Sequence, residues 1–227
     1  GGGYLTRDDL SHYQVIRRPP LQLKYRNARL FTNPPPASGG ILIAMALKLL
    51  EQQNVGALGF GSYQHLDLLA AGMAATNQAR LDMLLTNSDG VAEYLLEEQY
   101  LSQYRQQVAD RAQCLRGTTH ISVVDGFGNS ASMTVSNGEG CGYMAPGTGI
   151  MLNNMLGEED INPAGFHCWP ENQRMTSMMS PSLLQLDNGT SVALGSGGSN
   201  RIRTAILQVV SNLVDFAMSP EQAVSAP

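Results

Sequence analysis

Cysteine is scarce in this sequence, and its scarcity excludes one class of protein. Three cysteines, Cys114, Cys141 and Cys168, stand among 227 residues. An odd and sparse set of this kind does not build a disulfide framework, in which cysteines pair in even numbers. The sequence is therefore not that of a small disulfide-stapled scaffold, and it leaves the redox compartment open.

Basic clusters and long apolar runs are also lacking. The net charge is −5, and no group of lysines and arginines marks a nucleic-acid surface, so we expect no nucleic acid as the main partner. A membrane-spanning helix needs about 20 apolar residues. The longest apolar run, residues 41–50, is shorter and is interrupted by Lys48, which indicates a buried helix and no membrane span in this chain.

The histidines show no metal-ligand spacing. His65, His120 and His167 stand far apart, and Cys168 beside His167 has no further partners at the spacing of a zinc site. We interpret His120 as a strand residue rather than a catalytic base. The sequence therefore predicts neither a metal nor a cofactor.

Hydrophobic residues make up 43% of the chain, which excludes a disordered composition. A chain of this length can bury a core as one large domain or two small ones. The first half predicts a short helix after Thr6, with Asp9 at capping-box spacing, then two strands and several helices. We expect the strands at residues 21–25 and 29–32, and the helices at 41–52, 62–85 and 90–112.

Strands dominate the second half of the chain. Ile121 and Val123 alternate with Ser122, as expected of a half-buried strand. Alternating runs separated by Gly, Asp and Asn predict two hairpins, and a segment rich in Gly and Pro is typical of a lid or binding loop. We expect the hairpins at 121–125 with 130–136 and at 182–186 with 191–194, the irregular segment at 153–173, and helices at 201–216 and from Pro220, with Ser219 as the cap.

The boundary between the two halves is Gly117-Thr118, and Thr118 is a candidate nucleophile. A threonine hydroxyl is a poor nucleophile unless a base lies beside it, and cutting the preceding bond frees the α-amino group as that base. An α-amine has an unperturbed pKa of about 8, so it can accept a proton near neutral pH. The alternative is that Thr118 and Thr119 simply begin an edge strand.

A glycine-rich turn, residues 195–200, precedes the helix predicted at 201–216. A strand, such a turn and a helix N-terminus bring backbone N–H groups together, which suits a developing oxyanion. Two other interpretations are a tight turn that packs a strand on a helix, and a phosphate cradle. The cradle lacks the Gly-Lys-Ser/Thr that would follow it.

Eight short blocks of residues, spread over nearly the whole chain, together carry a resemblance to a known family. They are residues 1–10, 25–26, 33–40, 118–120 (Thr-Thr-His), 146–154, 180–181, 201–202 and 218–223. In this order and together, the blocks resemble the γ-glutamyltranspeptidase family of N-terminal-nucleophile hydrolases. The resemblance implies an α+β fold, the four-layer αββα sandwich of that superfamily.

The resemblance also implies how the chain is divided. Residues 1–117 match the C-terminal part of the large-subunit region and residues 118–227 the N-terminal part of the small-subunit region, together one αββα domain. We therefore expect a fragment, whose sandwich is incomplete or is completed by another copy, since truncated strand edges favour association into a homo-oligomer. Any export signal would lie upstream, and the resemblance alone points to a periplasmic or extracellular location.

The resemblance implies a role for Thr118 and two neighbours. Thr118 attacks the γ-carbonyl of a γ-glutamyl substrate and forms an acyl-enzyme, which water or an amine acceptor releases. Thr118 is first freed by autocleavage of the Gly117–Thr118 bond. Ser136 and Asn137 stand where relatives place a threonine and an asparagine that support the nucleophile.

Gly198 and Ser199 match the paired oxyanion glycines of the family. Ser199 departs from glycine at the second position. A backbone N–H donor survives this change if the serine adopts the φ and ψ of the glycine that it replaces.

Substrate recognition departs further from the family pattern. Glu158 matches the acidic residue that holds the substrate α-amino group, while Met155 replaces a glutamine. Ser177 matches the first of two serines that hold the α-carboxylate, while Met178 replaces the second and cannot donate a hydrogen bond. The carboxylate-binding arginine of the family lies upstream of this chain. The alternative for Glu158 is a solvated loop charge.

Three hypotheses about function follow. The first is a γ-glutamyl hydrolase or transferase with Thr118 as nucleophile. The second is a cephalosporin-acylase-like amidase of other specificity, which Met155, Met178 and Ser199 favour over strict glutathione use. The third is a non-enzymatic relative or an inactive fragment in which the bond before Thr118 stays uncut.

Overall fold

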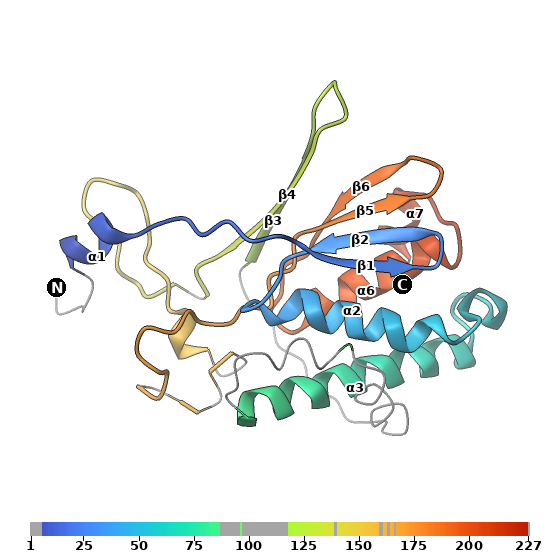
Figure 1. Cartoon of the computed structure of the whole chain (residues 1–227), viewed down its shortest axis with the longest axis horizontal. Coiled ribbons are helices and arrows are strands. Elements are labelled where there is room, and N and C mark those ends of the chain that lie inside the picture. The colour runs from blue at the N-terminus through green and yellow to red at the C-terminus, as the bar shows by residue number, and fades with distance from the viewer. Residues whose placement is uncertain are drawn as a thin grey trace.

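The computed structural model describes residues 6–86, 96, 118–138, 140–158, 161–162, 164–165 and 167–226 (Figure 1). The helix predicted at 90–112 lies outside these residues, as does Gly117, which precedes the candidate nucleophile. No helix in the described ranges is long and apolar enough to cross a membrane.

A four-stranded antiparallel sheet joins segments from both halves of the chain. Its strand order is β1-β2-β5-β6. The central pair, β2 and β5, matches Leu30 with Leu184, and both side chains are buried. The strands are β1 (Leu21–Tyr25), β2 (Ala28–Thr32), β5 (Ser182–Leu186) and β6 (Ser191–Leu194).

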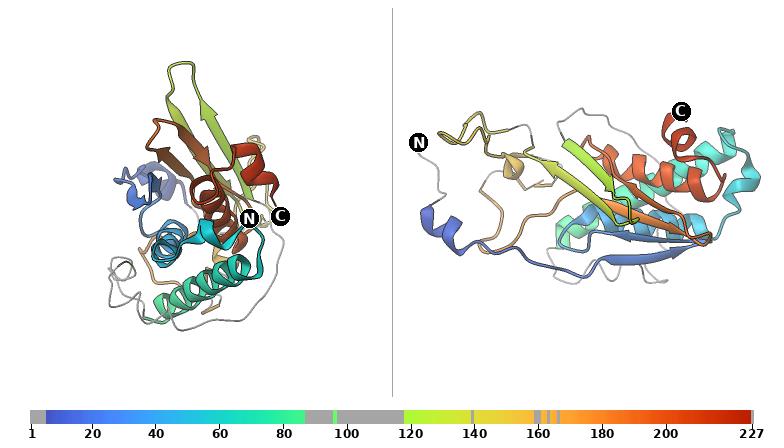
Figure 2. Two further views of the ribbon diagram at one scale, coloured as in Figure 1. Left: turned by 90° about the vertical axis from the view of Figure 1, so that its right-hand side faces the viewer. Right: turned by 90° about the horizontal axis from the view of Figure 1, so that it is seen from above.

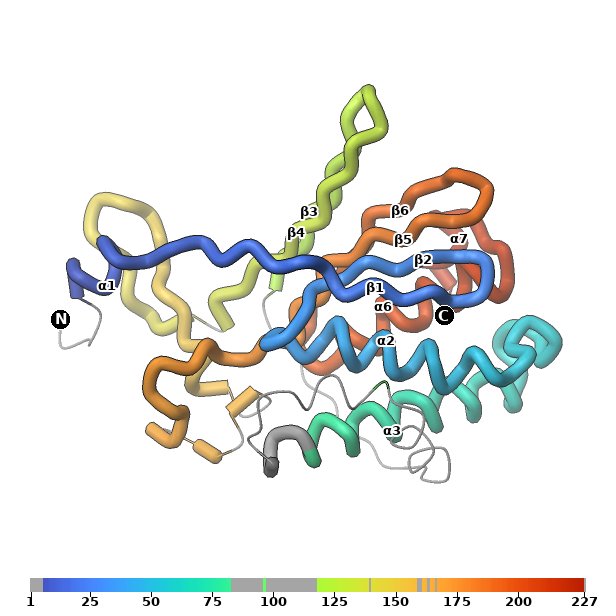
Figure 3. The backbone as a smooth tube through the Cα atoms, viewed as in Figure 1, coloured from blue at the N-terminus to red at the C-terminus, as the bar shows by residue number. Residues whose placement is uncertain are grey.

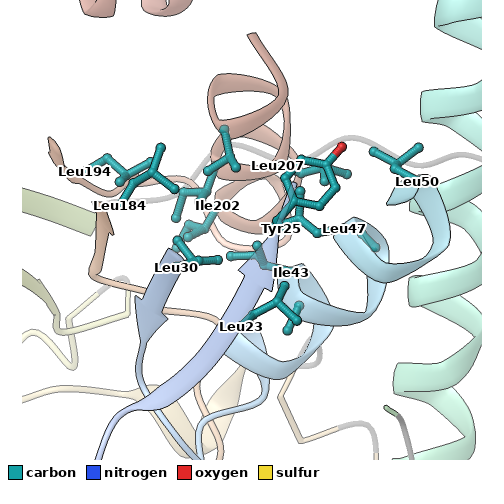
Figure 4. Close-up of a cluster of buried hydrophobic side chains, with 14 of the residues drawn as sticks. Leu23, Tyr25, Leu30, Ile43, Leu47, Leu50, Leu184, Leu194, Ile202 and Leu207 are labelled. Carbon is teal, nitrogen blue, oxygen red and sulfur yellow. The ribbon is translucent and has the colours of Figure 1, made fainter. Parts of the chain in front are cut away.

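Helices cover one face of this sheet. Figures 1 and 2 show α2 and α6 against the sheet and α3 outside α2. Figure 4 shows the core between them, in which leucine and isoleucine side chains from both helices meet those of the strands. Each fully buried side chain of this size contributes about 2 kcal/mol from apolar area alone. The helices are α1 (Arg7–His12), α2 (Ser38–Glu51), α3 (Tyr63–Thr86), α6 (Arg201–Val214) and α7 (Pro220–Ser225).

Helix α2 begins at Ser38, earlier than the predicted residue 41. The backbone N–H groups of Ser38 and Gly39 donate to the carbonyl of Ser177, at 3.0 and 3.2 Å. A Cβ added to Gly39 would overlap the carbonyl oxygen of Met178, so the glycine permits this close approach. The helix therefore starts where a distant segment caps it, and a local helix propensity does not reveal that position.

The far end of α6 is fixed by a polar cluster. The Tyr25 hydroxyl donates to Asp215 Oδ2 at 2.9 Å, and the Arg26 guanidinium forms an ion pair with the same carboxylate. Burial, together with the charge of Asp215, raises the pKa of Tyr25, so its hydroxyl stays a donor throughout the neutral range. This cluster anchors α6 to the turn between β1 and β2.

A second, two-stranded sheet is formed by the hairpin of β3 (Thr118–Val124) and β4 (Ser130–Ser136). The turn between its strands is closed by Asp125 Oδ1, which accepts from the N–H groups of Phe127 and Asn129, each at 2.9 Å. Figure 3 shows the hairpin running from the sheet and helices out to a projecting tip. Its base contacts β5 and β6.

The alternation predicted for β3 is present, but the face expected to be half-buried is the outer one. Among the described residues, Ile121 and Val123 are 43% and 56% exposed. His120 and Ser122 lie on the face toward the four-stranded sheet instead, and the Ser122 hydroxyl donates to the carbonyl of Ala193 in β6 at 3.1 Å. Hydrogen bonds to strand carbonyls, rather than apolar burial, therefore dock this hairpin.

Candidate active site

A pocket lies where the base of the hairpin meets the N-terminus of α6. It brings together five of the residues predicted from the sequence to form the site. These are Thr118, Ser136, Glu158, Ser177 and Ser199. Asn137 and Gly198 adjoin lining residues in the chain without lining the pocket themselves, and Gly117 lies outside the described residues.

Thr118 is the first residue of β3 and pairs with Ser136 of β4. Its Oγ1 donates to Ser136 Oγ at 3.2 Å. The same Ser136 oxygen accepts the backbone N–H of Gly138 at 3.1 Å, which holds it in place. The candidate nucleophile is therefore fixed at a strand end, with its hydroxyl oriented by a neighbour on the adjacent strand.

The glycine-rich turn packs directly on Thr118. A Cβ added to Gly197 would overlap the Thr118 carbonyl oxygen, so only glycine allows this approach. The next two residues have positive φ, 112° at Gly198 and 53° at Ser199. α6 begins at Arg201, with one residue in between, and its dipole places partial positive charge at this end of the pocket.

Ser199 adopts the left-handed conformation that is natural for the glycine it replaces. A positive φ is compatible with the condition under which its N–H can serve as a donor. A non-glycine residue held there costs about 1 to 3 kcal/mol, and such strain is found at functional sites.

A branched side chain at this turn position should be far less tolerated than serine. We expect Ser199→Val to destabilise the protein by about 2 kcal/mol, because β-branched residues avoid positive φ. Ser196→Val, in the same turn but without positive φ, is the matched control and should cost much less. Urea unfolding measures both, and equal destabilisation would contradict the backbone explanation.

Glu158 follows the short 3-10 helix η2 (Met155–Gly157), within the irregular segment. Its side chain is buried, with 8% exposure, so it is not a solvated loop charge. Its carboxylate lies against Gly138, where an added Cβ would be 2.6 Å from Oε1. The carboxylate therefore stands close to the backbone that also holds Ser136.

Ser177 and Met178 form the wall beside the start of α2. Ser177 Oγ accepts the N–H of Met179 at 3.0 Å, and Met178 Sδ lies 3.7 Å from Ser38 Oγ. Met178 is only 5% exposed. Met178, which replaces the second serine of the family pattern, therefore presents a buried thioether at this position.

Asn137 acts through its backbone in this structure. Its carbonyl accepts the N–H groups of Gly140 and Asn154, at 3.0 and 3.2 Å, and so closes the loop that follows β4. Within the described residues, no group of three His, Cys, Asp or Glu side chains could hold a metal ion.

Several lining residues were not predicted from the sequence. Ile161, Met179 and Ile202 complete the pocket together with Met155 and Met178. Met179 has no predicted role, and Ile202 belongs to one of the family blocks without a predicted role. The pocket thus has an apolar wall that local sequence patterns do not distinguish from core.

Comparisons with known proteins find similarity along the whole length of the chain. The family model described as Gamma-glutamyltranspeptidase matches residues 1–227. The chain is 33% identical over 243 residues to the Acylase ACY 1 proenzyme of Pseudomonas sp. (strain V22), covering 100% of this chain and 43% of that protein. It is 29% identical to the Glutathione hydrolase proenzyme of Escherichia coli (strain K12), covering 100% and 44%.

Among solved structures, cephalosporin acylase from Bacillus halodurans matches all of this chain and 43% of its own, with a TM-score of 0.80 at 24% identity. This likeness confirms the predicted mixed helix-and-sheet fold, of which the chain covers a part. The chain spans less than half the length of the curated relatives that it matches. With the family model matching from end to end, the chain belongs to the gamma-glutamyltranspeptidase family.

Proposed function

We propose that the protein containing this chain hydrolyses or transfers γ-glutamyl groups from amides, with Thr118 as an N-terminal nucleophile. The observation that supports this most is the placement of the Thr118 hydroxyl at a pocket, 3.2 Å from Ser136 Oγ and under the glycine-rich turn. Autocleavage of the Gly117–Thr118 bond would free the α-amine. The division of the chain at this bond, into residues 1–117 and 118–227, is part of the same proposal.

The reaction that we propose has two steps. The α-amine takes the proton from Thr118 Oγ1, which attacks the substrate carbonyl, and the backbone N–H groups of Gly198 and Ser199 stabilise the oxyanion. The α-ammonium then gives its proton to the departing amine, leaving a threonyl ester. Water or an acceptor amine attacks the ester in the same way and releases the product.

The other end of a γ-glutamyl group suits two residues of the pocket. The Glu158 carboxylate would pair with the substrate α-ammonium. Ser177 Oγ accepts one N–H from the backbone, and its own hydroxyl hydrogen would be donated to the substrate α-carboxylate. The acceptor is water or an amine, and no metal or cofactor takes part in these steps.

A second candidate function is that of an amidase for a more apolar acyl group. The observation that favours it is the pocket wall of Met155, Ile161, Met178, Met179 and Ile202. The relative at 33% identity is named an acylase. Turnover of hexanoyl or phenylacetyl p-nitroanilide in preference to γ-glutamyl p-nitroanilide would support this candidate over the first.

Restoring the missing serine should separate the two candidates. We expect Met178→Ser to raise kcat/KM for the γ-glutamyl amide relative to the hexanoyl amide by about tenfold or more, because a hydrogen bond to a charged group contributes about 1.5 to 3 kcal/mol. Met178→Ala removes the same bulk without adding a hydroxyl and is the matched control. The same relative change in both variants would count against a carboxylate site at this wall.

A further inference from the structure

The inward face of the hairpin is polar from Thr118 to Ser122, and only its tip end carries an apolar residue, Val124. Three side chains on each strand point toward the four-stranded sheet or across to the other strand, and an imidazole lies in the middle of them. On β3 these are Thr118, His120 and Ser122, opposite Ser136, Thr134 and Ser132 of β4. The sequence alone predicts that His120 is an ordinary strand residue, and the proposed mechanism does not use the imidazole.

The hydrogen bonds of His120 define which ring nitrogen carries the proton. Nδ1 lies 2.8 Å from Thr134 Oγ1, and Nε2 lies 2.9 Å from Ser122 Oγ. The Ser122 hydroxyl donates its hydrogen to the carbonyl of Ala193 at 3.1 Å. The Ser122 oxygen must therefore accept from Nε2–H, and in the neutral ring Nδ1 then accepts from the Thr134 hydroxyl.

The same ring lies against the glycine-rich turn. A Cβ added to Gly195 would overlap the His120 ring. Two residues further on, Gly197 packs on the carbonyl of Thr118, and Ser199 follows at the pocket. His120 therefore stands between the strand that carries the nucleophile and the turn that carries the candidate oxyanion donors.

The hydroxyl of Ser132 on β4 also holds the hairpin against the end of β6. Ser132 Oγ donates to the carbonyl of Leu194 at 2.9 Å and accepts the N–H of Ser182 at 3.1 Å. The last two residues of β6, just before the turn, are thus each held by a hairpin serine. Unlike the two serines, His120 also contacts the glycine-rich turn, where its ring lies against Gly195.

We propose that His120 is a positioning residue, which sets the glycine-rich turn relative to Thr118 through Ser122, Ala193 and its packing on Gly195. The inference rests on the proposed function of the pocket. His120 does not line the pocket and need not touch the substrate. Its loss should therefore displace the oxyanion donors from the reacting carbonyl and lower kcat, while KM changes little.

The neutral ring is favoured by its surroundings. Among the described residues, the His120 ring contacts the hydroxyls of Ser122 and Thr134 and lies against Gly195, none of which is charged. Burial lowers its pKa from the usual value of about 6.5. The positioning contribution of the neutral ring is complete above the usual pKa and is lost as the pH falls through the lowered pKa. His120 should therefore add an acid limb to the pH profile of kcat.

Three variants of the whole protein test the inference by kinetics. His120→Leu should lower kcat for γ-glutamyl p-nitroanilide by about ten- to a hundredfold, with little change in KM. His120→Gln places an amide N–H near the position of Nε2, and we expect it to recover most of the loss. His12→Leu, at an exposed histidine on α1, is the matched control and should leave kcat unchanged.

Equal losses in the Leu and Gln variants, or a loss that appears in KM rather than kcat, would overturn the positioning role. A second measurement does not depend on turnover. In ¹⁵N-histidine NMR spectra of the wild-type protein, we expect a neutral His120 protonated on Nε2 that titrates below the usual value, and an Nδ1–H tautomer would overturn the network. A wild-type protein that turns over no amide would overturn the proposed function, while the NMR result still decides on His120.

Discussion

Replacing Thr118 with alanine is expected to abolish amide turnover and to leave the Gly117–Thr118 bond uncut. Alanine has no hydroxyl to attack the preceding peptide bond or a substrate carbonyl, and the cut is what frees the α-amine. We expect kcat to fall by at least about 10⁴-fold, because a nucleophile and its base act as a unit and removing one of them removes the catalysis of both. Turnover of γ-glutamyl p-nitroanilide and electrophoresis of the protein measure the two effects.

Two further variants make this result specific. Thr118→Ser keeps a hydroxyl and should retain both cleavage and turnover at reduced rates. Thr119→Ala changes the next residue, an exposed side chain on the other face of β3, and should alter turnover by no more than about twofold. Undiminished turnover in Thr118→Ala would remove Thr118 from the mechanism.

Replacing Gly197 with alanine is the second change with a large expected effect. The added Cβ would overlap the backbone carbonyl oxygen of Thr118, which cannot swing away as a flexible side chain could. The turn or the strand must shift, and a displacement of about 1 Å at a reacting centre can reduce the rate about 100-fold. We therefore expect kcat to fall by about that factor.

Gly126→Ala is the matched control for this variant. Gly126 lies in the turn of the same hairpin, has open space where a Cβ would stand and does not have positive φ. It should retain wild-type kcat. If Gly197→Ala also retains it, the close approach of the turn to Thr118 has no part in the reaction.

The bounds of the short strands could be predicted from the sequence alone. Strands β1, β5 and β6 begin and end at the predicted residues, because alternating side chains and turn residues are local signals. The N-cap of α7 was likewise predictable, since Ser219 and Gln222 form a capping box around Pro220. In each case the residues that determine the element lie within it or next to it.

Features that depend on distant segments could not be predicted in this way. Helix α2 starts at Ser38 because the carbonyl of Ser177 accepts its first N–H groups. The hairpin turns its apolar face outward because Ser122 and Ser132 donate to carbonyls at the end of β6. A period of two residues predicts alternation but does not say which face lies inward.

The candidate site was predictable only in part. The resemblance selected residues from four separate segments, and Thr118, Ser136, Glu158, Ser177 and Ser199 all line one pocket. No local pattern indicates that they meet, because the pairing of β2 with β5 and the docking of the hairpin bring the segments together. Their chemical roles stay predictions until the variants are measured.

The measurement that tests the central claim most directly is the intact mass of the whole purified protein after incubation at neutral pH. We predict two pieces whose masses sum to that of the whole plus one water, the second piece beginning at Thr118. A single uncut species, or a cut at another bond, would contradict the account, because Thr118 would then have no free α-amine to activate its hydroxyl.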